Sequence, residues 1–168
     1  MHLAQINVGR LLYPVGDPRV ADFVNNLDAV NALAESSPGF VWRLKDEGSN
    51  NATSISAYED PTILINMSVW ETPEALYEFV YRTMHRRFVQ RRKEWFELFG
   101  AQYMALWWIE EGHEPPVNEG QRRLAHLERF GATPYAFGFK SLAPAGMHEP
   151  LGDVGDGRAA PESYRICG

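Results

Sequence analysis

Four stretches of the chain carry the pattern of apolar and polar residues that is typical of β-strands. Residues 2–10 alternate between an apolar set and a more polar set, as in a strand with one buried face. Residues 40–45, 62–70 and 102–110 are further runs rich in β-branched and aromatic residues. We therefore expect four strands, with a polar loop or turn between the second and the third.

Helical spacing of apolar residues separates these strands. Asp17-Pro18 is typical of an N-cap followed by the first helical residue, and an apolar stripe follows it. Thr72-Pro73 begins a second helix in the same way, and apolar residues then recur at helical spacing as far as Phe99. The second helix is thus predicted to be continuous from Pro73 to Phe99.

The element order, strand–helix–strand–strand–helix–strand, predicts an α+β fold. It is the order of a ferredoxin-like β-α-β-β-α-β antiparallel sheet with both helices on one face. The other face of such a sheet needs a cover, so we expect a homodimer that packs sheet on sheet.

The C-terminal third adds elements to this plan. Asn118 is predicted to cap a helix over residues 119–130 that Gly131 ends, and residues 135–139 are expected to add an edge strand. Residues 143–168 are rich in glycine and proline and lack periodicity. We predict one domain over residues 1–142 and a flexible tail over residues 143–168.

Composition narrows the function classes. The length of 168 residues fits one domain, and a net charge of -6 argues against a nucleic-acid partner. No run of about 18 apolar residues is present, so no membrane span is expected. A single cysteine, Cys167, and the lack of a signal-peptide pattern favour a cytoplasmic location. No metal-binding or nucleotide-binding motif is present, so the sequence predicts neither a metal nor a nucleotide.

Polar residues interrupt the apolar stripe of the second helix. His85, Phe88, Arg92 and Phe96 are three or four residues apart and are expected to share one helix face. Burying an imidazole or a cation costs free energy unless it gains a partner. We therefore expect a polar pocket beneath this helix, although the basic residues around His85 can also form a solvated face.

Strand parity supports the same pocket. Gln5 and Asn7 share one face of the first strand, and Asn66, Ser68 and Trp70 share one face of the third. If these polar sides coincide under the second helix, they form a ligand cavity with a few convergent polar groups. The alternative is a polar face that is wet or lies at a dimer interface.

Two residues on the other strands are further pocket candidates. Arg43 alternates with apolar neighbours and is a candidate pocket cation. Trp108 points to the opposite sheet face from Trp107, so one is expected in the core. The other is a core residue, a pocket wall or a dimer contact.

Several stretches of the chain resemble a known group of proteins. Gly39–Leu44, Phe79–Phe96 and Leu106–Phe137 are similar to a bacterial family of unknown function in the dimeric α/β-barrel superfamily. Ser68–His85 resembles that superfamily's junction between the third strand and the second helix. The superfamily includes cofactor-free antibiotic-biosynthesis monooxygenases, haem-degrading monooxygenases and chlorite dismutase-like proteins.

The resemblance implies roles for three residues. Asn7, Trp70 and His85 match, in type and order, residues that the haem-degrading branch uses. In that branch His85 would be the axial haem ligand, and Asn7 would donate near the iron-bound oxygen. In the cofactor-free monooxygenases, Asn and Trp hold a phenolic substrate, and His85 would then act as the base.

Three functions stay open from the sequence. The leading one is binding, with oxidation or isomerisation, of a small aromatic or carboxylate-bearing molecule without a cofactor. Here Arg92 would hold an anion, and Asn66, Ser68, Phe88, Trp108 and Arg43 would contact the ligand. The second is haem binding through His85. The third is a non-catalytic dimeric module whose buried His and Arg satisfy each other.

Overall fold

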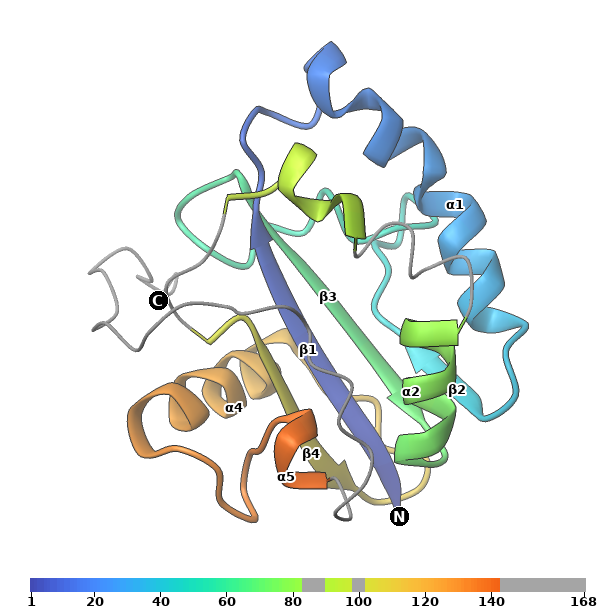
Figure 1. The fold of residues 1–168 in the computed structure, drawn as a ribbon, viewed down its shortest axis with the longest axis vertical. Helices are drawn as coiled ribbons and strands as arrows, with labels where there is room; N and C mark the ends of the chain where they lie inside the picture. The colour runs from blue at the N-terminus through green and yellow to red at the C-terminus, as the bar shows by residue number, and fades with distance from the viewer. Residues whose placement is uncertain (83–89, 98–101, 143–168) are drawn as a thin grey trace.

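The sheet is built around its N-terminal strand, as the computed structural model shows for residues 1–82, 90–97 and 102–142 (Figure 1). Strand β1 (His2–Arg10) pairs antiparallel with β3 (Ile63–Trp70) on one side and with β4 (Met104–Ile109) on the other. Strand β2 (Phe40–Arg43) pairs antiparallel with β3 at the edge. The strand order β2-β3-β1-β4 is that of the predicted ferredoxin-like sheet.

The predicted α+β architecture of a four-stranded antiparallel sheet with helices is confirmed. Helix α1 (Ala21–Glu35) follows β1, and helix α2 (Pro73–Arg82) follows β3. The short 3-10 helix η1 (Pro18–Val20) precedes α1, and the side chain of Asp17 accepts a hydrogen bond from the backbone N–H of Arg19. The predicted cap is therefore present.

Helices α1 and α2 cover one face of the sheet. Ala34 of α1 and Leu76 and Phe79 of α2 pack with Leu3, Trp70 and Leu106 from three strands. The end of α1 is followed by Gly39, whose φ of 77° lies in the left-handed region. A Cβ at this position would also lie 2.6 Å from the Cβ of Ala75. Glycine is therefore needed where β2 meets α2.

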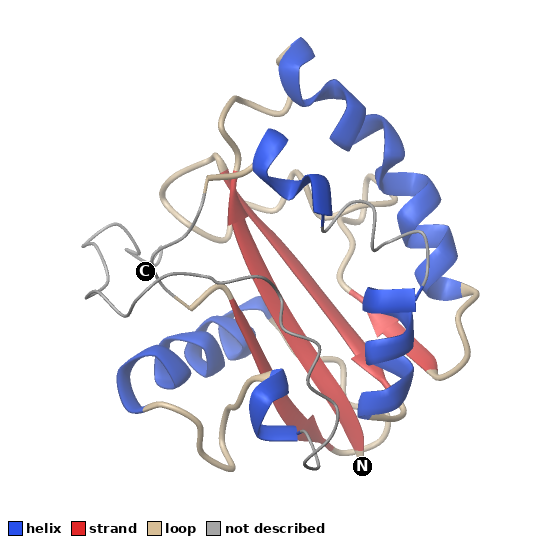
Figure 2. Cartoon of the chain, viewed as in Figure 1, coloured by secondary structure: helices blue, strands red, loops and turns tan. Residues whose placement is uncertain are grey.

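The opposite face of the sheet is covered by the same chain. Helix α4 (Val117–Phe130) packs Leu124 and Leu127 against the apolar face that contains Ile6, Met67 and Trp107. Figure 2 shows α4 apart from α1 and α2, on the other side of the sheet. The uncovered face that led us to expect a sheet-on-sheet homodimer is thus occupied by α4, and the homodimer itself stays a prediction.

The prediction of one helix from Pro73 to Phe99 is wrong at its C-terminal end. The 3-10 helix η2 (Arg92–Glu94) is followed by Phe96, which forms an antiparallel bridge with Leu11. The backbone N–H of Glu97 donates to the carbonyl of Arg10. From Glu97 on, pairing with the extension of β1 therefore takes the place of helical hydrogen bonds. Periodicity within one segment cannot foresee this.

Smaller corrections concern the C-terminal elements. Helix α4 begins at Val117, with Pro116 at the N-cap position, so Asn118 is not the cap; Gly131 follows its last residue as predicted. The edge strand expected over residues 135–139 is reduced to isolated bridges, of Phe137 with Leu106 in β4 and of Ala136 with Thr133. They are followed by the short helix α5 (Phe139–Leu142). The predicted tail, residues 143–168, lies outside the described residues.

Among the described residues, no helix is both long enough and apolar enough to cross a membrane.

Candidate functional site

A ladder of hydrogen-bonded polar side chains crosses the sheet face beneath α1 and α2. Gln5 and Ser68 are Cα partners, and so are Asn7 and Asn66, so their side chains lie on the same face. Nε2 of Gln5 donates to Oδ1 of Asn66 at 2.7 Å and to Oγ of Ser68 at 2.9 Å. Nδ2 of Asn7 donates to Oε1 of Gln5 at 3.3 Å. The expectation that the polar sides of β1 and β3 coincide is met.

Trp70 closes one end of this polar ladder. Its indole Nε1 donates to Oγ of Ser68 at 2.9 Å, and the side chain is fully buried. The ring stacks on Phe79 with centroids 5.1 Å apart and meets Phe40 edge-on at 5.4 Å. The tryptophan therefore joins the polar ladder to the apolar packing of α2.

A cavity of about 330 Å³ lies over the ladder. Its floor includes the ladder residues, and its walls come from α1, α2, η2 and the segment after β2. The apolar part of the wall includes Phe23, Val30, Leu76, Phe79, Trp95 and Phe96. A mostly apolar wall with a few convergent polar groups is typical of a small-molecule site.

Arg92 places a cation at the cavity without a carboxylate partner in the part of the chain that the structure describes. It lies on η2, lines the cavity and is partly buried. Two phenols, Tyr81 and Tyr103, line the same cavity. Burial, together with the neighbouring Tyr103 and Tyr77, raises the pKa of Tyr81 to about 12, and the charge of Arg92 opposes this rise. The Tyr81 hydroxyl is therefore protonated at neutral pH and able to donate a hydrogen bond.

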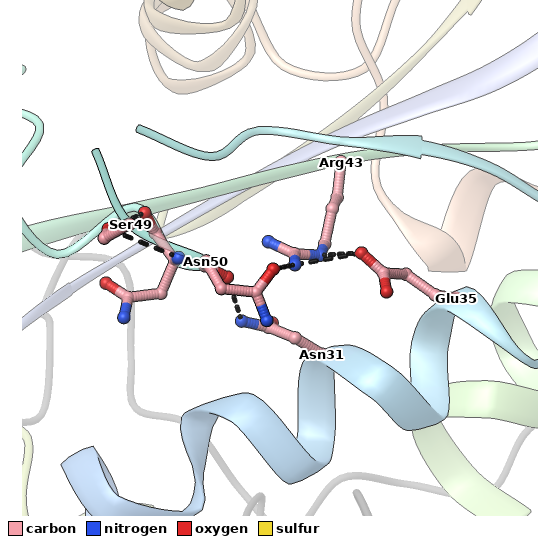
Figure 3. Close-up of polar contacts among 6 residues, drawn as sticks. Asn31, Glu35, Arg43, Ser49 and Asn50 are labelled. Atoms are coloured by element: carbon pink, nitrogen blue, oxygen red, sulfur yellow. Dashed lines mark hydrogen bonds and ion pairs between the residues drawn. The ribbon is translucent and has the colours of Figure 1, made fainter. Parts of the chain in front are cut away.

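Arg43 forms a second cationic wall of the cavity and is almost fully buried, with 5% of the residue exposed. Its Nε and Nη2 lie 3.0 and 2.9 Å from Oε1 of Glu35 on α1. Nη2 also donates to Oδ1 of Asn50 at 2.7 Å. Asn50 lies in the loop after β2. Asn31 of α1 donates to the backbone carbonyl of Asn50 and so connects this loop to α1 (Figure 3). The guanidinium thus connects β2, α1 and the loop after β2.

The structure brings together most of the side chains that the sequence singled out. Eight of them line the same cavity: Gln5, Asn7, Arg43, Asn66, Ser68, Trp70, Arg92 and Phe96. Trp108 does not line it: the residue is 38% exposed, and its ring centroid lies 6.4 Å from that of Phe137. His85 and Phe88 lie outside the described residues. The catalytic and binding roles assigned from the sequence stay predictions.

Sequence reasoning missed several cavity residues. Asn31 lies four residues after Leu27, on the buried side of α1, so helical spacing is the sequence signal that points to it. Tyr81 and Tyr103 carry no such signal, because their contribution depends on how α2 and β4 are brought together. Trp95 was assigned to a long helix, whereas it packs with Leu11 and Val20 next to the end of β1.

The chemistry of the described site does not identify a metal or a cofactor. Within residues 1–82, 90–97 and 102–142, no group of three or more His, Cys, Asp or Glu side chains is placed to hold a metal ion. Haem binding was predicted through His85, which lies outside this part of the chain, so haem stays an alternative from the sequence.

These features define an α+β protein with a four-stranded antiparallel sheet and a ligand-sized cavity on its polar face. The chain belongs to the family described as "Domain of unknown function (DUF3291)", which matches residues 2–151. This confirms the resemblance to an uncharacterised family.

Two solved structures are similar to this chain. One is PA3566 from Pseudomonas aeruginosa, with 15% identity and a TM-score of 0.41 over 62% of this chain and 88% of that chain. The other, from Chloroflexus aurantiacus J-10-fl, carries the name "putative Antibiotic biosynthesis monooxygenase". It has 17% identity and a TM-score of 0.38 over 68% of this chain and 98% of that chain. No curated protein matches the chain.

Proposed function

We propose that this protein binds a small aromatic molecule bearing an acidic group in the cavity above the polar ladder. The observation that carries the proposal is Arg92, which lines a mostly apolar cavity of about 330 Å³ and has no ion pair with a described carboxylate. That volume lies within the range of ligand pockets. A cation that lines such a cavity without a carboxylate partner among the described residues is suited to an anionic ligand.

The wall chemistry supports an aromatic body for the ligand. Three aromatic residues line the cavity: Phe79 of α2, and Trp95 and Phe96 of the segment after η2. Aromatic side chains pack well against planar rings, in stacked or edge-on geometry. The amide groups of Asn7 and Asn66 and the hydroxyl of Tyr81 add hydrogen-bonding groups around that apolar space.

We further propose that the bound molecule is oxidised by molecular oxygen, or isomerised, without a cofactor. Both reactions begin by removing a proton from the ligand, which leaves negative charge on a ligand oxygen. Side-chain amides and the protonated Tyr81 hydroxyl can stabilise that charge but are poor bases at neutral pH. In this proposal the base is His85, whose ordinary pKa near 6.5 suits the task.

Calorimetric titration of the purified protein with para-ethylbenzoate tests the binding. We expect saturable binding that weakens at least about fivefold in Arg92→Gln, because a charge-assisted hydrogen bond is lost. Lys93→Gln is the matched control: it removes the same charge one residue away, from an exposed side chain that does not line the cavity. Equal weakening in both variants, or none in Arg92→Gln, would contradict the assignment of Arg92.

A further inference from the structure

Two buried side chains on adjacent strands line the cavity wall. Arg43 of β2 and Ser68 of β3 are Cα partners, so their side chains are neighbours on the same sheet face. Only 5% of Arg43 and 7% of Ser68 is exposed. Both residues line the cavity.

The guanidinium of Arg43 has a nitrogen that the fold leaves without a partner. Nε and Nη2 are occupied by Glu35 and Asn50, as Figure 3 shows. Nη1 is buried and has no hydrogen-bond partner among the described residues. A buried donor without an acceptor is costly and rare, so its presence beside a cavity requires an explanation.

The hydroxyl of Ser68 also has a hydrogen-bond donor without an acceptor among the described residues. Its Oγ accepts from Nε2 of Gln5 and from Nε1 of Trp70. Indole Nε1 is a donor only, and the Gln5 amide donates through its NH₂ group, so both contacts use the lone pairs of Oγ. The Ser68 hydroxyl hydrogen remains to be donated, and no acceptor for it occurs in the described parts of the chain.

We propose that Arg43 and Ser68 form a binding site for a carbonyl oxygen of the ligand. One such oxygen accepts two hydrogen bonds and can satisfy both donors. Glu35 already supplies a negative charge to Arg43, so a neutral acceptor fits better here than a second carboxylate.

This site is separate from the one assigned to Arg92. Figure 1 shows η2, which carries Arg92, and β2, which carries Arg43, near different ends of β3, so the two arginines come from elements that lie apart along the sheet. The inference rests on the proposed function and refines its substrate class. The ligand is an aromatic acid with its acidic group at Arg92 and a ketone or quinone oxygen at Arg43 and Ser68.

A matched pair of probes separates the two sites. Para-acetylbenzoate carries a ketone opposite its carboxylate, and para-ethylbenzoate has the same outline without the ketone oxygen. We expect the wild-type protein to bind para-acetylbenzoate about fivefold more tightly, as one to two added hydrogen bonds allow. The ratio of the affinity for para-acetylbenzoate to that for para-ethylbenzoate should fall to near one in Arg43→Lys and in Ser68→Ala.

Asn50→Ala is the structural control. It removes the Asn50 Oδ1 contact to Nη2 but leaves Nη1 in place, so the affinity ratio should persist. Circular dichroism shows whether each variant is folded. If Arg43→Lys does not fold, the affinity ratio of Ser68→Ala alone tests the inference. A lost ratio in Asn50→Ala as well would show that Arg43 acts only by holding the loop, and would overturn the inference.

The remaining outcomes distinguish the two proposals. Equal affinity of the wild-type protein for both probes, with Arg92→Gln weakening both, would overturn the carbonyl site and keep the proposed function. Absence of binding of either probe to the wild-type protein would overturn the proposed function, and the carbonyl site with it.

Discussion

The side-chain amide of Gln5 on β1 donates to the hydroxyl oxygen of Ser68 on β3, with Nε2 and Oγ 2.9 Å apart. The same amide reaches Asn66 on β3 and accepts from Asn7 on its own strand. Gln5 therefore orients the polar groups on the cavity floor. Only 5% of the residue is exposed.

Replacing Gln5 with leucine should destabilise the protein although the volume is nearly kept. Leucine offers neither donor nor acceptor, so Ser68, Asn66 and Asn7 each lose a hydrogen-bond partner. We expect a loss of about 2 kcal/mol in the free energy of unfolding, measured by urea denaturation. Gln102→Leu, at an exposed glutamine, is the control and should change stability by less than about 0.5 kcal/mol. Equal effects of the two substitutions would show that the hydrogen bonds of Gln5 do not stabilise the fold.

Gly9→Ala should disturb the wall of the cavity. A Cβ on Gly9 would lie 2.7 Å from Cδ1 and 2.9 Å from Cε1 of Phe96, whose ring packs edge-on against Phe23. Because a stiff ring must move, we expect a loss of about 1–3 kcal/mol in urea unfolding. Gly9→Ala combined with Phe96→Leu tests the cause.

The smaller, flexible leucine relieves the contact, so Gly9→Ala should cost less in the Phe96→Leu background than in the wild-type protein. A strictly additive double variant would mean that contact with Phe96 is not the source of the loss.

Glu119 should make the stability depend on pH in the acid range. Burial by itself would raise its pKa, but hydrogen bonds from His113, Arg123 and Trp107 outweigh this and hold the pKa below its ordinary value. A carboxyl with a lowered pKa in the folded state stabilises that state above its unfolded pKa, near 4.3. This contribution is lost as the pH falls from there through the lower folded pKa.

Glu119→Gln provides the measurement. We expect it to lower the free energy of unfolding at pH 7 by about 1–2 kcal/mol, since charge-assisted hydrogen bonds are weakened. Below about pH 4 the difference from the wild-type protein should shrink. Glu114→Gln, at an exposed carboxylate before α4, serves as the comparison and should show neither effect. A difference for Glu119→Gln that is constant from pH 7 to pH 3 would assign the loss to packing instead of charge.

The expected homodimer has a direct test. Light scattering coupled to size-exclusion chromatography gives the molar mass in solution, and a homodimer would have twice the 19.1 kDa of one chain. Because α4 already covers the apolar sheet face of its own chain, a dimer would need another surface.

Patterns within single segments were enough for the sequence to determine the strands and their two faces. Alternation along β1 and β3 placed Gln5, Asn7, Asn66 and Ser68 on one face, because side chains of a strand point to opposite sides in turn. The N-cap at Asp17 was equally readable, since capping depends on residues close in sequence.

Contacts between distant segments were decided only by the tertiary structure. The second helical region ends where Phe96 pairs with Leu11. The apolar face of the sheet is covered because α4 packs on Ile6 and Met67. The partners of Arg43 come from α1 and from a loop, which no spacing along the chain predicts. The sequence therefore determined which side chains share a strand face, because that follows from backbone geometry. The tertiary structure decided which of them enclose a cavity, because enclosure depends on long-range packing.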